Sequence, residues 1–412
     1  MNGIKAKPLT NILVKPAGPD CNMRCGYCFY NCKTALFPES SRHRMSDSVL
    51  DEMIKQLMRK GSDRISISWQ GGEPALAGLP FFQQAINLIQ RYGSNQEVSN
   101  GFQTNGILLD RAWAGFFRKY AFLVGLSIDG SRHIHDRYRT FSGGRGTFSI
   151  VSDTAMMLLD EGVSVNALSV VNDYSVLYPE ETYTFLRDIG LVYMQFIPCV
   201  EADAENPEKM APYSVSPERY GAFLCTMFDL WRSDFIDGCP KTSIRFFDSL
   251  LFSYAGFEAP ECTLQPECGN YLVVEHNGNI YSCDFFVEAG RLLGKIPGGD
   301  LASLLNSEKQ IAFGRAKSRL PQPCSRCRWL NCCNAGCPKE REMPGSIGKP
   351  YLCEAYKIFF HHADQEMRRL VRIWKSRPPG EEFCTDRKPY KAGRNEPCPC
   401  GSGLKHKKCC AV

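Results

Sequence analysis

The sequence lacks the long apolar segments that mark membrane spans and export signals. Its 412 residues contain no apolar run longer than the one near 121–128, which is too short to cross a bilayer. The N-terminal segment MNGIKAKPLTNILVKP has no apolar core of the length found in signal peptides. We therefore expect no membrane span and a cytoplasmic location.

A strong charge of one sign is also absent. The formal net charge is +5, and much of it lies in residues 387–412, where seven Lys and Arg residues accompany one Glu. The rest of the chain is nearly neutral, so nothing in it predicts nucleic-acid binding.

Cysteine, in contrast, is abundant, with 21 residues. Disulfides neither form nor persist in a reducing compartment, so this content indicates metal sites. Cys21, Cys25 and Cys28 follow the strand-like segment 12–15 with C-x3-C-x2-C spacing, which lets one loop wrap an iron-sulfur cluster. Three thiolates leave one iron of a four-iron cluster open. From this loop alone, a half-built zinc site is the alternative.

The order of elements predicts an α/β fold. From residue 10 to about 200, apolar strand-like runs alternate with amphipathic helical segments, as in a parallel sheet covered by helices. Ser46 predicts a helix N-cap, and Pro80 opens a helix over 81–92 at a position that needs no amide donor. The six predicted strands are 12–15, 65–69, 97–104, 122–128, 163–171 and 192–197. Six strand-helix units predict a partial (β/α)6 barrel, with its chemistry at the carboxyl ends of the strands.

Glycine-rich or polar segments follow three of these strands: GGEP at 71–74, QTNG at 103–106 and GLSIDG at 125–130. Glycines at the first segment permit close approach of the backbone to a ligand, although a plain turn is the alternative. The hydroxyl of Ser127 and the carboxylate of Asp129 are costly to bury unpaired, so they predict either a polar ligand or a helix cap.

After about residue 233 the alternation stops, and cysteine, glycine and proline dominate up to Cys353. This composition predicts a domain whose fold is stabilised by bound metal, followed by a helix over 354–374. Its cysteines run C-x5-C-x14-C from Cys262 to Cys283 and C-x2-C-x5-C-x3-C from Cys324 to Cys337. With Cys353 they are sufficient for two further four-iron clusters, with zinc as the alternative.

Taken together, the motifs CNMRCGYCFY, QGGEP, QTNG, GLSIDG, IPC and CD and the final cysteine set resemble those of the anaerobic sulfatase-maturating enzymes. These are radical S-adenosylmethionine (SAM) enzymes with a SPASM domain. The resemblance implies oxidation of a sulfatase Cys or Ser, in a Cys/Ser-x-Pro/Ala-x-Arg motif, to Cα-formylglycine. A 5′-deoxyadenosyl radical would remove hydrogen from Cβ, and flavodoxin or ferredoxin would donate the electron.

The same resemblance implies the roles of individual residues. SAM would contact Tyr27, Gly72, Ser127, Arg139 and Val200, with Arg137 and Arg145 near enough in sequence to be confused with Arg139. Asp284, directly after a cluster cysteine, would be the base, and a turn or capping role is the alternative. Three four-iron clusters would use Cys21, Cys25 and Cys28; Cys262, Cys268, Cys283 and Cys337; and Cys324, Cys327, Cys333 and Cys353. Because Cys332 adjoins Cys333, the sequence leaves open which of these two cysteines is the cluster ligand.

The C-terminal segment resembles the SEC-C zinc motif. Its C-x-C-x8-C-C pattern offers Cys398, Cys400, Cys409 and Cys410 as four thiolates for one zinc ion, and so short a module needs the metal to fold. A reactive thiol cluster or a flexible end is the alternative. The resemblance implies a secretion chaperone or the ribosome as partner. The predicted domains are 10–233, 234–376 and 390–412, with a linker at 377–389.

Two other functions remain open from the residues alone. Another SPASM radical peptide maturase, forming thioether or carbon-carbon links, would share every cluster. A non-enzymatic zinc scaffold bound to the secretion machinery is suggested by the C-terminal tail alone.

Overall fold

The computed structural model describes residues 6–236, 239–346 and 348–376. They form two compact units. Of the described residues, the first unit draws on 6–126, 157–164 and 267–316, and the second on 127–156, 165–236, 239–266, 317–346 and 348–376. Within the described ranges, no helix combines the length and the apolar composition needed to cross a membrane.

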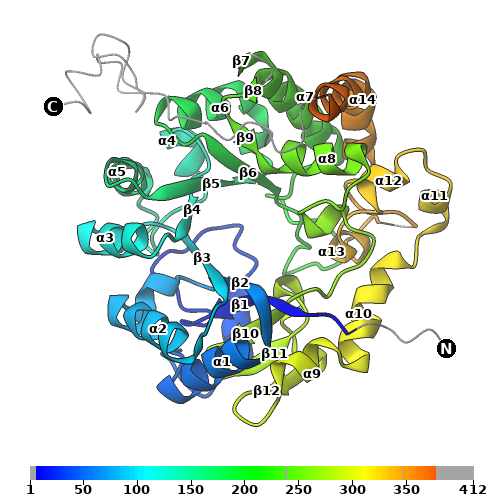
Figure 1. Cartoon of the computed structure of the whole chain (residues 1–412). Coiled ribbons are helices and arrows are strands. Elements are labelled where there is room, and N and C mark those ends of the chain that lie inside the picture. Colours follow the sequence, from blue (N-terminus) through cyan, green and yellow to red (C-terminus); the bar gives the residue numbers. More distant parts are fainter. Residues whose placement is uncertain (1–5, 237–238, 347, 377–412) are drawn as a thin grey trace, which may run out of the picture. The chain divides into compact units, whose positions relative to one another are not determined.

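A mainly parallel sheet forms the centre of the first unit. Each successive pair is parallel among β1 (Leu9–Lys15), β2 (Gly61–Trp69), β3 (Glu97–Thr104) and β4 (Leu123–Ser127). On its other side β1 pairs in parallel with β10 (Leu272–Glu275), which continues through antiparallel β11 (Asn279–Tyr281) and β12 (Leu292–Lys295). Figure 1 shows β10 and β11 beside β1, although they come much later in the chain. The parallel order brings the carboxyl ends of β1, β2 and β3 to one edge of the sheet.

Helices accompany this sheet in the first unit. Ser46 caps the first helix as predicted, because its hydroxyl accepts a hydrogen bond from the Val49 amide at 3.4 Å. The second helix begins at Leu79, one residue before Pro80. Phe82 and Phe102 anchor the aromatic core, with ring centroids 5.1 Å apart. The helices are η1 (Asn31–Leu36), α1 (Asp47–Lys60), η2 (Pro74–Ala77), α2 (Leu79–Tyr92), α3 (Arg111–Lys119), η5 (Asp284–Phe286), η6 (Ala289–Arg291), α9 (Leu301–Leu305) and α10 (Glu308–Ser318).

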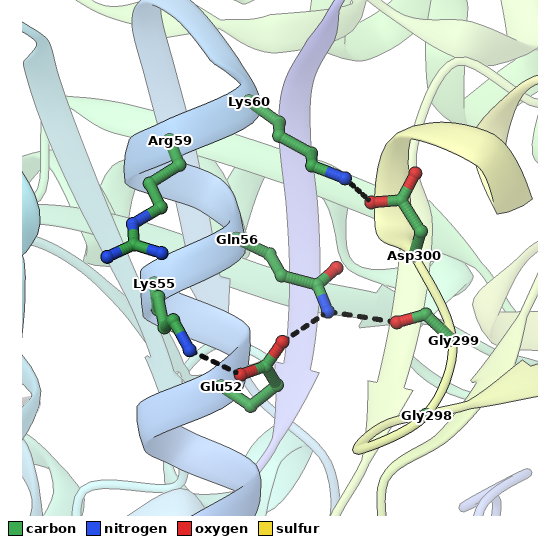
Figure 2. Close-up of a pocket in the computed structure, with 8 residues that line it drawn as sticks. All are labelled: Glu52, Lys55, Gln56, Arg59, Lys60, Gly298, Gly299 and Asp300. Atoms are coloured by element: carbon green, nitrogen blue, oxygen red, sulfur yellow. Dashed lines mark hydrogen bonds and ion pairs between the residues drawn. The ribbon is translucent and has the colours of Figure 1, made fainter.

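A pocket of about 370 Å³ with mostly polar lining residues lies where α1 faces the loop before α9. Figure 2 shows the residues that line it. The Gln56 side chain bridges the two elements: its Nε2 donates to the Gly299 carbonyl at 2.9 Å, and its Oε1 accepts from the Leu301 amide at 2.8 Å. Lys60 pairs with Asp300 at 2.5 Å. These contacts fasten α1 to the later segment, and the pocket contains none of the predicted site residues.

The second unit has its own parallel strands, β5 (Ser164–Val171), β6 (Tyr193–Pro198) and β9 (Ser243–Ile244). The last helix packs against α7 and α8, as Figure 1 shows, and the rings of Phe247 and Phe359 stack at 5.4 Å. The remaining elements are β7 (Phe235–Ile236), β8 (Cys239–Pro240), η3 (Ser175–Leu177), η4 (Cys262–Leu264), α4 (Arg132–His135), α5 (Phe148–Asp160), α6 (Pro179–Asp188), α7 (Pro217–Ser233), α8 (Arg245–Ala255), α11 (Gln322–Ser325), α12 (Leu330–Cys333), α13 (Pro338–Arg341) and α14 (Cys353–Lys375).

The predicted α/β fold with a parallel sheet is confirmed. A strand lies at each of the six predicted places, and the predicted helix over 354–374 is α14, Cys353–Lys375. No local pattern predicted β10, β11 and β12, which extend the first unit's sheet. The predicted domain boundaries remain predictions.

Candidate active site

The three-cysteine loop leaves the carboxyl end of β1. Cys21 is exposed, and Cys25 and Cys28 are partly exposed. A turn closes the loop, because the Cys28 amide donates to the Cys25 carbonyl at 3.2 Å. The three thiols thus belong to one short, hydrogen-bonded segment that remains open to a ligand.

Asp20 fixes the start of this loop. Its carboxylate pairs with the His43 ring at 2.7 Å and with the Arg44 guanidinium at 2.6 Å. Burial opposes ionisation of Asp20, but the hydrogen bonds from His43 and Arg44 outweigh it and lower the pKa of the carboxyl group. The negative charge therefore stays in place and holds the residue that precedes Cys21.

The GGEP loop packs directly on the cysteine loop. The Gly72 amide donates to the Gly18 carbonyl at 2.8 Å, and the Glu73 amide donates to the Asp20 carbonyl at 2.7 Å. A Cβ at Gly72 would lie 2.0 Å from the Asp20 carbonyl oxygen, so only glycine permits this approach. The predicted role of Gly72 at SAM thus gains a structural reason, although the role itself stays a prediction.

Glu73 joins the GGEP loop to the QTNG segment. Its buried carboxylate accepts hydrogen bonds from the Ala75 amide at 2.9 Å, the Thr104 hydroxyl at 2.8 Å and the Asn105 amide at 2.8 Å. Burial raises the pKa of Glu73 to about 7, against the effect of these hydrogen bonds. The sequence analysis assigned Glu73 no role of its own.

Asn105 carries this connection on to the cysteines. Its Nδ2 donates to the Asn22 side-chain oxygen at 2.7 Å and lies 3.6 Å from the Cys21 sulfur. The Asn22 Nδ2 is buried and has no hydrogen-bond partner among the described residues, which suits a loop that receives a polar ligand. The three strand-end segments thus form one hydrogen-bonded edge around the thiols.

The donor atoms of the first loop suit an iron-sulfur cluster. Cys21, Cys25 and Cys28 offer three exposed or partly exposed thiols on one short segment, and cysteine thiolates are the ligands that hold such clusters. The predicted open iron of a four-iron cluster stays a prediction.

Asp284 lies on the same unit, at the start of η5 and directly after Cys283. Its partly buried carboxylate forms an ion pair with the ammonium of Lys15, the last residue of β1. Lys15 is itself buried, with 1% of its side chain exposed. The pairing gives the Asp284 carboxylate a buried cationic partner, and the predicted role of Asp284 as the base stays a prediction.

In the second unit, Ser127, Arg139 and Val200 are all buried. The Arg139 Nε lies 3.0 Å from the carboxylate of Asp129, which also accepts the Val170 amide at 2.9 Å. This pair anchors Arg139 at the end of β4. From the sequence, Asp129 was expected to contact a ligand or to cap a helix. In the structure its carboxylate pairs with the guanidinium of Arg139.

The structure also separates Arg139 from the other two candidates. Arg137 and Arg145 are exposed, and their guanidinium groups lie over the rings of Tyr174 and Phe141, at 5.3 and 4.7 Å from the ring centroids. Only Arg139 of the three is buried beside a carboxylate, which favours it as the SAM contact. Tyr27 is also buried, and its predicted contact with SAM stays a prediction.

Four cysteines of the second unit line one pocket: Cys324, Cys327, Cys333 and Cys353. Aromatic side chains, including Trp329, complete its walls. These are the ligands predicted for one auxiliary cluster. Cys332 does not line this pocket, because its thiol interacts with Tyr254 instead, so the geometry favours the register that uses Cys333.

The other predicted set of four is divided between the units, with Cys268 and Cys283 in the first and Cys262 and Cys337 in the second. The Cys283 sulfur accepts the Tyr271 hydroxyl at 3.3 Å. This ligand set stays a prediction. Cys398, Cys400, Cys409 and Cys410, predicted to bind zinc, lie outside the described residues.

Three family models match the chain. Residues 16–189 match the radical SAM superfamily, residues 262–328 match the SPASM iron-sulfur cluster-binding domain, and residues 394–411 match the SEC-C motif. Iron-sulfur clusters are therefore indicated for both the loop that carries Cys21 and the later cysteine-rich segment.

Similar proteins cover nearly the whole chain. The serine-type anaerobic sulfatase-maturating enzyme of Bacteroides thetaiotaomicron is 38% identical over 375 residues, which are 87% of this chain and 90% of that protein. The cysteine-type enzyme of Clostridium perfringens is 34% identical over 369 residues, 89% of this chain and 98% of that protein. A solved structure, "Native anSMEcpe with bound AdoMet and Cp18Cys peptide", has a TM-score of 0.81 at 32% identity and covers 89% of this chain and 100% of its own.

Proposed function

The chain belongs to the anaerobic sulfatase-maturating enzymes, and we propose that it oxidises a Cys or Ser in the active-site motif of a sulfatase to Cα-formylglycine. The resemblance stated from the motifs is thereby confirmed. The observation that carries the proposal is the loop of three cysteines, whose preceding residues Gly18 and Asp20 accept hydrogen bonds from the GGEP segment at Gly72 and Glu73. It is an oxidoreductase of the radical SAM class.

Three four-iron clusters and SAM are the cofactors that we assign. When bound, the first cluster and SAM supply the 5′-deoxyadenosyl radical that removes a hydrogen atom from the target Cβ. Cys21, Cys25 and Cys28 would hold that cluster, and the pocket of Cys324, Cys327, Cys333 and Cys353 would hold one auxiliary cluster. Cys262, Cys268, Cys283 and Cys337 would hold the other.

The chain's own residues bind and orient the reactants. Gly72 would let its backbone approach the methionine amino group, Ser127 and Arg139 would bind the methionine carboxylate, and Tyr27 and Val200 would pack against the nucleotide. Asp284 would take the proton from the substrate thiol or hydroxyl. With substrate bound, these residues would exclude water, so that one C–H bond meets the radical.

The test uses reconstituted protein under anaerobic conditions with dithionite. A peptide that carries Cys-x-Pro-x-Arg and its Ser counterpart are each incubated with SAM, and mass spectrometry looks for the aldehyde. We expect the aldehyde from at least one peptide and none from Cys25→Ala. Deoxyadenosine without aldehyde, or a crosslinked peptide, would instead support another SPASM maturase, and absence of deoxyadenosine would support a non-enzymatic scaffold.

The matched SEC-C motif adds a finer proposal about partners and location. Residues 390–412 would bind Zn²⁺ through Cys398, Cys400, Cys409 and Cys410 and dock a secretion chaperone or ribosome in the cytoplasm, so that sulfatases are modified before export. Flavodoxin or ferredoxin would supply the electron. The domains would be those expected from the sequence, 10–233, 234–376 and 390–412 with a linker at 377–389. Deleting residues 390–412 should lower formylglycine in an exported sulfatase in cells but not in the peptide assay; unchanged maturation in cells would exclude the docking role.

A further inference from the structure

Lys15 is a buried cation in the wall of the site. It is the last residue of β1, after the apolar residues Ile12, Leu13 and Val14, and 1% of its side chain is exposed. Burying an ammonium group costs free energy unless the charge is paired. The fold alone gives no reason for a charge here, since an apolar residue would continue the strand.

The contacts of Lys15 hold it on three sides. Its ammonium pairs with the carboxylate of Asp284 and lies 3.4 Å from the centroid of the Tyr30 ring, within the range of a cation–π contact. Its stem passes beneath the GGEP loop, where a Cβ at Gly71 would lie 3.2 Å from the Lys15 Cβ. The Lys15 side chain therefore has little freedom to move away from Asp284.

The neighbouring buried carboxylate is engaged elsewhere. Glu275 on β10 is the register partner of Lys15, and it accepts a hydrogen bond from the Tyr30 hydroxyl. Tyr30 thus contacts Lys15 with its ring and Glu275 with its hydroxyl. This arrangement leaves the ammonium of Lys15 directed at Asp284, the carboxylate proposed as the base.

We propose that Lys15 is a positioning residue for Asp284 in formylglycine formation. The inference rests on the proposed role of Asp284 as the base. In that step the substrate S–H or O–H bond breaks and an O–H bond forms on Asp284, while the Cβ hydrogen atom goes to the deoxyadenosyl radical. The one electron that remains on the substrate would pass to an auxiliary iron-sulfur cluster. With a Cys target, water would then replace the sulfur, which leaves as hydrogen sulfide. By fixing the carboxylate from behind, Lys15 keeps one of its oxygens aimed at the substrate proton, because misplacement of a reacting group by about 1 Å costs up to about 100-fold in rate.

The experiment compares Lys15→Met, which keeps the length but removes the charge, with Lys15→Arg, which keeps the charge. Reconstituted full-length variants receive SAM, dithionite and the substrate peptide, and the measured quantity is formylglycine formed per deoxyadenosine released. We expect this ratio to fall roughly 10- to 100-fold in Lys15→Met and to recover in part in Lys15→Arg. Lys60→Met is the matched control, because it removes an exposed lysine of the same unit that pairs with Asp300.

The outcomes separate the two proposals. A wild-type ratio in Lys15→Met overturns the positioning role, and a wild-type ratio in Asp284→Asn overturns the base. If both single variants lose coupling, the double variant should be no worse than Asp284→Asn alone; a further independent loss would contradict action through Asp284. If Lys15→Met does not fold, Lys15→Gln decides, because it also removes the charge but keeps a polar group. With wild-type iron content its ratio should lie well below that of wild type, and a ratio equal to wild type refutes the proposal.

Discussion

The pKa of Glu73 leads to a quantitative prediction about stability. Its ordinary value is 4.5, and burial raises it to about 7 in the folded chain. Between these two values the folded state binds more protons than the unfolded state. The stabilisation of the folded state that comes from protonated Glu73 is therefore fully present below pH 4.5, and it is lost as the pH rises through 7. The difference between the two pKa values corresponds to a change of about 3 kcal/mol in the free energy of unfolding over the whole pH window. About 2 kcal/mol of this change falls between pH 5.5 and pH 8.

Replacing Glu73 by Gln removes the ionisation but keeps the shape. The new amide group faces a backbone donor, the Asn105 or the Ala75 amide, and one unmade buried hydrogen bond costs about 1–3 kcal/mol. Glu73→Gln should therefore be the less stable protein at pH 5.5. By pH 8 the difference should shrink by about 2 kcal/mol, because only the wild type loses stability on ionising.

The assay is urea unfolding of anaerobically purified protein, followed by tryptophan fluorescence at both pH values. Glu97→Gln is the matched control, since that carboxylate is exposed and pairs with Arg64 at 3.2 Å; its difference from wild type should not change with pH. A difference between Glu73→Gln and wild type that stays constant with pH would refute the reasoning. It would mean that the three hydrogen bonds keep Glu73 ionised despite its burial.

Three further predictions follow from the site and from Figure 2. Cys333→Ala should lose about four iron atoms per chain in an anaerobic iron assay while Cys332→Ala keeps them, and equal losses would contradict the register. Arg139→Lys should raise the KM for SAM severalfold in the deoxyadenosine assay, because lysine replaces a planar, paired guanidinium by a point charge; an unchanged KM would redirect the search to another cation. Gln56→Ala should lower the free energy of unfolding in urea by about 1–3 kcal/mol, because the Gly299 carbonyl and the Leu301 amide lose their partner. Lys60→Ala, which breaks an exposed ion pair, should lower it by less than about 1 kcal/mol. Similar losses in the two variants would contradict this ranking.

The strand ends and the first cysteine loop were predictable because each depends on local pattern. Apolar runs predict strands, glycines predict turns, and the C-x3-C-x2-C spacing predicts a cluster-binding loop. Each of these predictions uses only a short stretch of sequence. The choices left open were of another kind. Whether Arg137, Arg139 or Arg145 is buried depends on how the chain folds back after β4, and whether Cys332 or Cys333 enters the pocket depends on the turn of α12.

The Lys15–Asp284 pair was beyond the reach of the sequence, because it depends on β10. That strand has only four residues and lies in a segment rich in glycine and cysteine, so its parallel pairing with β1 leaves no local signal. Without the pairing of β1 with β10, Lys15 would be expected to be a solvent-exposed residue at the end of a strand. Asp284 was therefore predictable as a candidate base from the sequence, whereas its cationic partner Lys15 was not.

The register of β1 and β10 links the two halves of the chemistry. β1 leads at its carboxyl end into the loop of Cys21, and its last residue, Lys15, binds Asp284, which follows β11. Because successive side chains of a strand point to opposite faces, a slip of one residue between Lys15 and Glu275 would turn the ammonium away from the carboxylate. The same strand therefore leads into the loop proposed to carry the radical cluster and binds the base proposed to take the substrate proton. The relative placement of these two groups depends on the backbone pairing of β1 with β10.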